Sequence, residues 1–141
     1  MEPLAVVEAW FQRVWNEGDL SAIDDLAAPS AKFHGLPSTD GAAIAGPEGF
    51  KSYARAFRSS FPDMRIDVLR RVCQGSMVAV HCSVKGVNSG TGLRPSPTGK
   101  SISIEGMTIA RVENGRIQEG WNCYDGKLMY QQLGILPPDP L

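Results

Sequence analysis

The sequence is poor in the features that mark disulfide-rich or metal-binding proteins. Cysteine occurs only 3 times in 141 residues. The spacing of Cys73, Cys82 and Cys123 offers neither a disulfide framework nor a Cys-x-x-Cys metal site. We therefore expect all three to be reduced thiols in the core. The 2 histidines stand on separate segments with no third ligand nearby, so we expect no metal.

An excess of charge of one sign is also missing. The chain has 14 basic and 15 acidic residues, a formal net charge of −1, whereas nucleic-acid binding usually needs clustered cationic charge. No apolar run approaches the roughly 18 residues that span a bilayer. Glu2 stands where a signal peptide would carry a basic residue. We expect a cytoplasmic protein without a nucleic-acid or membrane partner.

The sequence contains enough hydrophobic residues for one packed core. Hydrophobic residues make up 43% and charged residues 21%, ordinary values for a globular domain. A chain of this length has no room for a second core of ordinary size. We expect a single domain over residues 1–141.

The first half of the chain has helical periodicity. Apolar residues recur at three- and four-residue steps from Leu4 to Trp15, which predicts an amphipathic helix that begins at Pro3 and ends near Asn16. A short helix over residues 20–27 and a third helix from Pro47 to a point before Pro62 should follow. Residues 31–34 have the pattern of a short strand.

From Met64 onward the period changes to two. This predicts strands around residues 66–72 and 78–84, then over 101–113 and 116–124, with a last helix over 127–133. Helices followed by consecutive antiparallel strands indicate an α+β domain with helices on one face of a sheet. A curved sheet of this kind can enclose a pocket.

The last two strands are joined by Asn114-Gly115, a strong signal for a two-residue hairpin turn. Regular pairing from that turn puts Glu119, Trp121 and Asp125 on the face covered by the helices. A carboxylate there is costly to bury in its charged form, so its pKa should rise toward the range useful for proton transfer. Asp125 is thus a candidate acid/base, and Trp121 beside it is a candidate substrate-binding residue of the pocket wall. Glu119 suits a solvated or ion-paired position near the hairpin end. Asp125 also precedes the last helix, so it could simply be an N-cap.

The same register puts Met107, Ile109 and Tyr124 on the outer face of the sheet. Clustered apolar side chains there suit a homodimer contact, although scattered exposed apolar residues are equally ordinary.

Other candidates for a binding pocket come from elsewhere in the chain. His34 ends the predicted strand that leads toward the pocket and is the second candidate proton carrier, or else a hydrogen-bonded structural histidine. The helix aromatics Trp15, Tyr53 and Phe57 are either plain core or the walls of an apolar pocket for a flat ligand. Asn88 could hydrogen-bond a ligand carbonyl.

Several motifs resemble those of the SnoaL-like polyketide cyclases. The C-terminal half carries Pro97-Thr98-Gly99-Lys100, Asn114-Gly115-Arg116-Ile117, Trp121-Asn122-Cys123-Tyr124-Asp125 and Gln132-Leu133-Gly134. Trp15-Asn16-Glu17-Gly18-Asp19 and Gly46-Pro47-Glu48-Gly49 fit the N-terminal half, so the resemblance covers nearly the whole chain. It implies a cone-shaped α+β barrel of the ketosteroid-isomerase type, with a curved antiparallel or mixed sheet wrapped around N-terminal helices, usually dimeric.

The resemblance also implies a chemistry. Family cyclases close a ring by aldol condensation of a polyketide ester without metal or organic cofactor, and their acid/base aspartate corresponds to Asp125. Relatives commonly read Gly-Thr-His-Thr-Gly where this chain has Gly86-Val87-Asn88-Ser89-Gly90, so Asn88 replaces a polar pocket histidine. We expect acid/base ring closure or isomerisation of an apolar carbonyl compound. The alternatives are a non-catalytic module for ligand binding or dimerisation, and a cofactor-independent hydroxylase or epoxide hydrolase.

Overall fold

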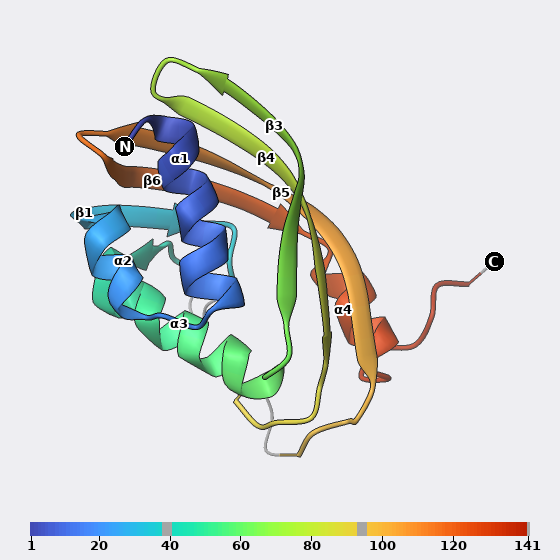
Figure 1. Ribbon diagram of the computed structural model, residues 1–141. Helices are drawn as coiled ribbons and strands as arrows, with labels where there is room; N and C mark the ends of the chain where they lie inside the picture. The colour runs from blue at the N-terminus through green and yellow to red at the C-terminus, as the bar shows by residue number, and fades with distance from the viewer. Residues whose placement is uncertain (38–40, 93–95, 141) are drawn as a thin grey trace.

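The computed structural model describes residues 1–37, 41–92 and 96–140. Figure 1 shows N-terminal helices packed in the hollow of a strongly bent sheet. The helices are α1 (Pro3–Ala9), a π-helix η1 (Trp10–Asn16), α2 (Ser21–Leu26), α3 (Gly46–Ser60) and α4 (Gly126–Gln132). The strands are β1 (Ala27–His34), β2 (Ile44–Ala45), β3 (Arg65–Gln74), β4 (Met77–Val87), β5 (Ser101–Glu113) and β6 (Arg116–Tyr124). The α+β class is confirmed.

The described strands form one sheet in the order β2-β1-β6-β5-β4-β3. Strand β1 runs parallel to β6, whereas the pairs β3-β4, β4-β5 and β5-β6 are antiparallel, so the sheet is mixed. Its two edges do not meet, and the helices fill its concave side (Figure 1). The expected cone, a curved sheet wrapped around N-terminal helices, is the observed architecture.

The first helix changes its winding after Ala9. Sequence periodicity predicted one helix over residues 3–16, and the structure continues α1 as the π-helix η1, in which the Glu17 N–H donates to the Gln12 carbonyl at 2.9 Å. A π-helical turn is wider than an α-helical one. Four large side chains of η1 are buried against the sheet: Trp10, Phe11, Val14 and Trp15. No described helix has the length and apolarity needed to cross a membrane.

Strand β1 begins earlier than the sequence pattern indicated. We expected helix as far as residue 27 and strand only from 31, but the strand covers Ala27–His34. Pro29 lies where the pairing of β1 with β6 shifts register, between Ala27 and Lys32. Proline lacks the N–H that regular pairing needs, so it is tolerated at such an irregularity.

The β5-β6 hairpin has the predicted turn but not the predicted register. Asn114 and Gly115 both have positive φ, 55° and 72°, as a two-residue hairpin turn requires. Val112 pairs with Ile117, but Arg111 pairs with Glu119, so Gln118 is an extra residue in β6. A one-residue insertion moves every later side chain to the opposite face. The predicted inward positions of Glu119 and Trp121 are therefore wrong.

The cysteines were only partly predicted. Cys82 is fully buried in β4, but Cys73 and Cys123 are exposed. The exposure of Cys123 follows from the same register shift, because this residue lies beyond Gln118 and its side chain therefore faces outward. Cys73 sits near the end of β3, which is exposed along most of its length.

Candidate functional site

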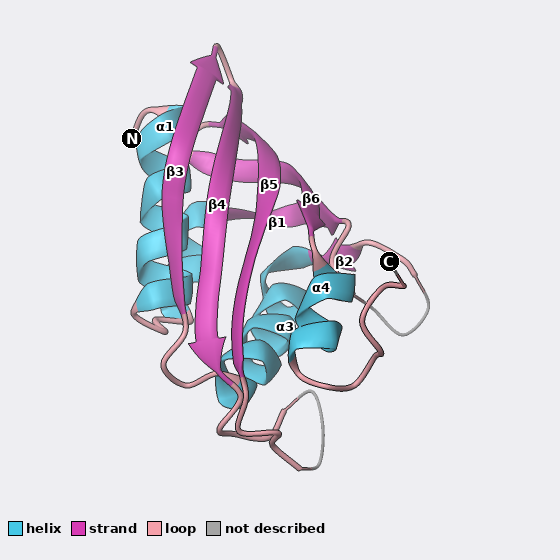
Figure 2. Cartoon of the chain, turned by 90° about the vertical axis from the view of Figure 1, so that its right-hand side faces the viewer, coloured by secondary structure: helices cyan, strands magenta, loops and turns pink. Residues whose placement is uncertain are grey.

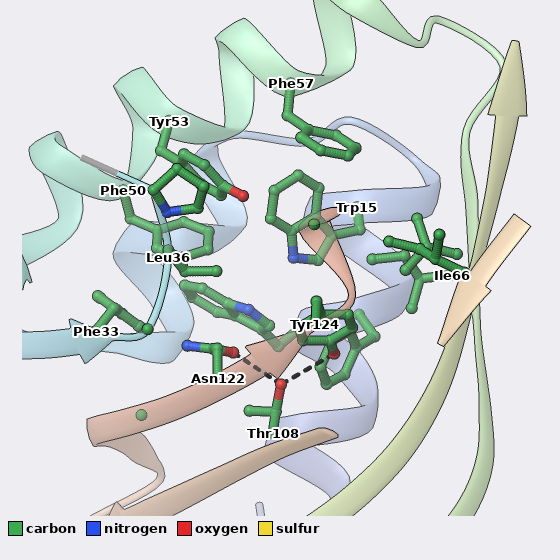
Figure 3. Close-up of a pocket in the computed structure, with 18 of the residues that line it drawn as sticks. Trp15, Phe33, Leu36, Phe50, Tyr53, Phe57, Ile66, Thr108, Asn122 and Tyr124 are labelled. Atoms are coloured by element: carbon green, nitrogen blue, oxygen red, sulfur yellow. Dashed lines mark hydrogen bonds between the residues drawn. The ribbon is translucent and has the colours of Figure 1, made fainter. Parts of the chain in front are cut away.

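A cavity of about 500 Å³ lies between the helices and the inner face of the sheet. That size suits a drug-sized or polycyclic molecule. Its described lining comes from α1, η1, α3, α4, the inner faces of β1 and β3–β6, and the segment after β1. Figure 3 shows its aromatic character. None of the described lining residues carries a charge.

The helical wall of the cavity contains the aromatic residues proposed from the sequence. Trp15, Tyr53 and Phe57 all line the cavity. The Trp15 ring makes edge contacts with Tyr53 and Phe57, at centroid distances of 5.9 and 5.8 Å. Phe50 packs behind them, 5.7 Å from Trp15 and 5.9 Å from Tyr53. A flat apolar ligand would contact this wall; that these residues bind one remains a prediction.

The sheet wall carries the polar groups, and the sequence analysis missed them. Thr108 on β5 donates its hydroxyl proton to Asn122 Oδ1 at 2.8 Å and lies 3.0 Å from the Tyr124 hydroxyl (Figure 3). All three residues line the cavity. Asn122 and Tyr124 face inward because of the extra residue Gln118; Tyr124 had been expected on the outer face, which is wrong.

One sequence feature could have revealed the true register. Gly106 pairs with Tyr124, and a Cβ built on Gly106 would lie 2.2 Å from Tyr124 Cδ2. The glycine leaves room for the tyrosine ring on the same face of the sheet. A glycine opposite a large aromatic residue is a known cross-strand arrangement, whereas regular pairing from the turn would have matched Gly106 with Cys123.

His34 lies outside the described lining of the cavity. Its Nε2 is 2.6 Å from Glu119 Oε2, and its ring stacks on Trp121 with centroids 5.8 Å apart. The hydrogen bond with His34 lowers the pKa of Glu119, and Arg111 adds to this effect. The structure thus brings together three residues singled out from the sequence, but on the outer face of the sheet. The predicted place of Trp121 in the pocket wall is wrong, since its side chain faces outward.

Asn88 organises a loop and does not contribute to the described lining. Its side chain is buried, donates to the carbonyl groups of Ser60 and Gly90, and accepts from the Thr98 N–H at 2.8 Å. These contacts use both its donor and acceptor groups. The position expected to replace a pocket histidine therefore holds the β4-β5 connection against the end of α3.

Asp125 is exposed and caps α4. Its Oδ1 accepts a hydrogen bond from the Leu128 N–H at 3.0 Å, the geometry of an N-cap. The carboxylate is not on an inner face, so the expectation that it is buried is wrong. Its neighbours Tyr124 and Gly126 both line the cavity, which leaves Asp125 at the cavity rim. Its role in proton transfer remains a prediction.

We expect Asp125→Ala to lower the free energy of unfolding by about 1 kcal/mol, because it removes the cap of α4. Asp125→Asn should cost at most a few tenths of that, since asparagine caps about equally well. Urea denaturation of the three proteins measures both values. Equal stability of Asp125→Ala and the parent chain would show that the cap contributes nothing.

The cavity can hold a small molecule, but its described walls contain no group that titrates near neutral pH. Burial raises the pKa of Tyr53 and of Tyr124, so both hydroxyls stay protonated. Among the described residues, no cluster of three potential metal ligands is present. The site offers neutral hydrogen-bond donors and acceptors in an apolar enclosure.

Comparison with known proteins gives the family. A family model described as SnoaL-like polyketide cyclase matches residues 5–133. The solved structure of IdmH from Streptomyces antibioticus, provisionally named a polyketide cyclase, is 30% identical, with 95% of this chain and 99% of that chain aligned and a TM-score of 0.82.

More distant structures share the fold. A provisionally named polyketide cyclase from Bacillus cereus is 24% identical, with 93% of this chain and 79% of that chain covered and a TM-score of 0.78. A ketosteroid-isomerase-like protein from Catenulispora acidiphila, solved with trimethylamine, is 17% identical, with 96% and 97% covered and a TM-score of 0.75. No protein with a curated description matches significantly. The family model, which spans most of the chain, and the IdmH likeness agree with the cone and its cavity: this chain belongs to the SnoaL-like polyketide cyclase family.

Proposed function

We propose that this protein binds an apolar, carbonyl-containing small molecule in the cavity and promotes its ring closure or isomerisation by acid/base chemistry without a cofactor. One observation carries the proposal: a cavity of about 500 Å³ with aromatic walls and a polar cluster at one side. An uncharged enclosure disfavours ionic ligands, because their desolvation would not be compensated. Membership in the cyclase family supports the type of chemistry.

The proposed proton carriers are Asp125, at the rim of the cavity, and His34, on the outer face of the sheet. Each is next to lining residues: Asp125 lies between Tyr124 and Gly126, and His34 directly precedes Gly35. To reach a ligand, Asp125 would exchange its bond to the Leu128 N–H for one to the substrate, and His34 would leave Glu119. General acid/base help of this kind typically contributes about 10²- to 10⁴-fold in rate.

Exchange of α-protons tests this chemistry without knowledge of the natural substrate. The probe is 2-tetralone, a neutral bicyclic ketone, incubated with the protein in deuterated buffer and followed by mass spectrometry. We expect the protein to accelerate deuterium uptake and Asp125→Asn, which keeps the cap, to reduce the acceleration about 100-fold or more. His34→Gln is the parallel variant for the second carrier. Unchanged exchange in both variants would rule out both residues as proton carriers.

A non-catalytic binding protein is the second candidate, and the capping geometry of Asp125 is the observation that favours it. In that case 2-tetralone would bind with no deuterium uptake above the buffer rate. The same experiment therefore separates the two functions.

We also propose a homodimer through the outer face of the sheet. The support is a row of side chains that crosses the sheet on paired positions: Val72, Ala79, Ile109, Trp121 and His34. Val72, Ile109 and Trp121 are 69%, 43% and 38% exposed. Figure 2 turns the outer face of β3, β4 and β5 toward the viewer, with α1 and α3 behind it.

Ile109→Glu would place a charge in the middle of this row. We expect the parent chain to sediment as a dimer and Ile109→Glu as a monomer, because a carboxylate in an apolar contact loses its hydration without gaining a partner. The exposed Leu136, on the C-terminal segment outside the sheet, gives the control Leu136→Glu, which should leave the mass unchanged. A monomeric parent chain would contradict the proposal.

A further inference from the structure

The hydrogen-bonding groups of the sheet wall are already committed to one another. Asn122 Nδ2 donates to the His34 carbonyl at 3.0 Å, which orients the amide and turns Oδ1 toward Thr108. The hydroxyl proton of Thr108 goes to that oxygen, so Tyr124 is the donor in its 3.0 Å contact with Thr108 Oγ1, and the Cys82 thiol is the other hydrogen-bonding neighbour of the Tyr124 hydroxyl. This series of hydrogen bonds therefore runs in one direction, from Tyr124 through Thr108 and Asn122 to the His34 backbone carbonyl. Tyr124 has no proton left for a ligand.

The helical wall is different, because it holds polar hydrogens without partners. Within the described residues, neither the Tyr53 hydroxyl nor the Trp15 indole N–H makes a hydrogen bond. Among the described residues, every side-chain nitrogen or oxygen that is fully enclosed by protein has a hydrogen-bond partner. The Tyr53 hydroxyl and the Trp15 indole N–H have none, so both atoms are accessible from open space. Both residues line it, and Figure 3 shows both side chains reaching into it from α3 and η1.

The two rings that carry these donors are in contact and are held rigidly. Their rings meet edge to face at 5.9 Å with an interplanar angle of 83°. Phe50 and Phe57 pack against Trp15 on either side of this contact. An indole N–H can only donate, and the Tyr53 hydroxyl stays protonated because burial raises its pKa. Donors on two touching rings that open into one apolar cavity suit an acceptor oxygen of a ligand held there.

We infer that Tyr53 and Trp15 together bind the carbonyl oxygen of the ligand, and that the ligand is a neutral, flat ketone, quinone or ester whose acceptor edge faces the helices. The inference rests on the proposed function and deepens it, since it assigns the carbonyl to the helical wall and not to the polar cluster on the sheet. Tyr124 can still accept a hydrogen bond there, so a hydroxyl on the opposite edge of the ligand would fit.

A matched pair of probes isolates the carbonyl. Fluorenone and fluorene share one tricyclic frame and differ in that only fluorenone carries a carbonyl oxygen. Calorimetric titration should show the parent protein binding fluorenone about three- to tenfold more tightly than fluorene, the value of one or two hydrogen bonds. Tyr53→Phe should remove most of this preference and leave fluorene binding unchanged.

Tyr124→Phe is the matched control, because it removes the same atom from the same cavity. Its proton is committed to Thr108, so this variant should keep the preference for fluorenone. The infrared carbonyl stretch of bound fluorenone should move to lower frequency in the parent protein and in Tyr124→Phe, but not in Tyr53→Phe. A preference lost in Tyr124→Phe and kept in Tyr53→Phe would overturn the inference while leaving the proposed pocket intact. Equal binding of fluorenone and fluorene to the parent protein would also overturn the inference and leave the proposed pocket intact. Failure of both probes to bind would overturn the proposed pocket as well.

Discussion

Gly35→Ala is expected to lower the free energy of unfolding by about 3 kcal/mol or more. Gly35 has φ of +80°, a conformation that costs an alanine about 1–2 kcal/mol. A Cβ built there would also lie 1.9 Å from the Asn122 carbonyl oxygen, so β1 and β6 would have to separate. Forced overpacking of this kind typically costs a further 1–3 kcal/mol, roughly. Urea denaturation measures the total.

Gly75→Ala is the control for the backbone conformation alone. Gly75 has φ of +58° in the β3-β4 turn, and a Cβ there would meet no atom within 4 Å. Gly75→Ala should therefore lower the free energy of unfolding by only about 1–2 kcal/mol. The difference between the variants measures the close approach of β1 to β6, which holds Asn122 against His34. Equal losses in the two variants would contradict this role of Gly35.

Phe50→Ala is expected to cost about 3–5 kcal/mol, a large part of the stability of a domain of this size. The side chain is 2% exposed and contacts the rings of Trp10, Phe33, Trp15 and Tyr53. Removing it would enlarge the cavity on the helical wall and free the Trp15 and Tyr53 rings from one of their supports. Thermal or chemical denaturation measures the loss.

Phe61→Ala separates stability from binding. Phe61 is fully buried and packs on Phe57, but it does not line the cavity. Phe50→Ala and Phe61→Ala should lose comparable stability. Only Phe50→Ala should weaken fluorenone binding, because it alters the cavity wall. Equal weakening in both would mean that binding depends on general stability and not on the local arrangement of the aromatic rings.

The sequence was sufficient for most of the fold, because hydrophobic periodicity and turn residues are local signals. Pro3, Pro47 and Asn114-Gly115 mark real element starts and a real turn. The aromatic wall was also predictable, since Trp15, Tyr53 and Phe57 lie on apolar helix faces that must pack against a sheet.

The polar side of the site was not predictable from those signals. The extra residue Gln118 is stabilised by hydrogen bonds from its side chain to the Glu113 and Arg116 carbonyls, which no periodicity records. That one insertion exchanges Trp121 and Cys123 for Asn122 and Tyr124 on the inner face. Because Trp121 and Cys123 are apolar, the regular register also predicts a mainly apolar inner face, and the hydrophobic pattern therefore favoured the wrong register.

The three tryptophans allow a direct test of where a ligand binds. Trp10 and Trp15 line the cavity, and Trp121 lies on the outer face of the sheet, 38% exposed. Each indole N–H gives a separate signal in a nitrogen-15 correlation spectrum, and substitution of each tryptophan in turn assigns the three signals. The measurement is a titration of the labelled protein with fluorenone.

We predict that the signals of Trp10 and Trp15 shift on addition of fluorenone, with the larger shift at Trp15, and that the signal of Trp121 stays in place. This result would place the ligand between the helices and the inner face of the sheet. A shift confined to Trp121, or no shift at saturating fluorenone, would contradict the claim that the cavity is the binding site.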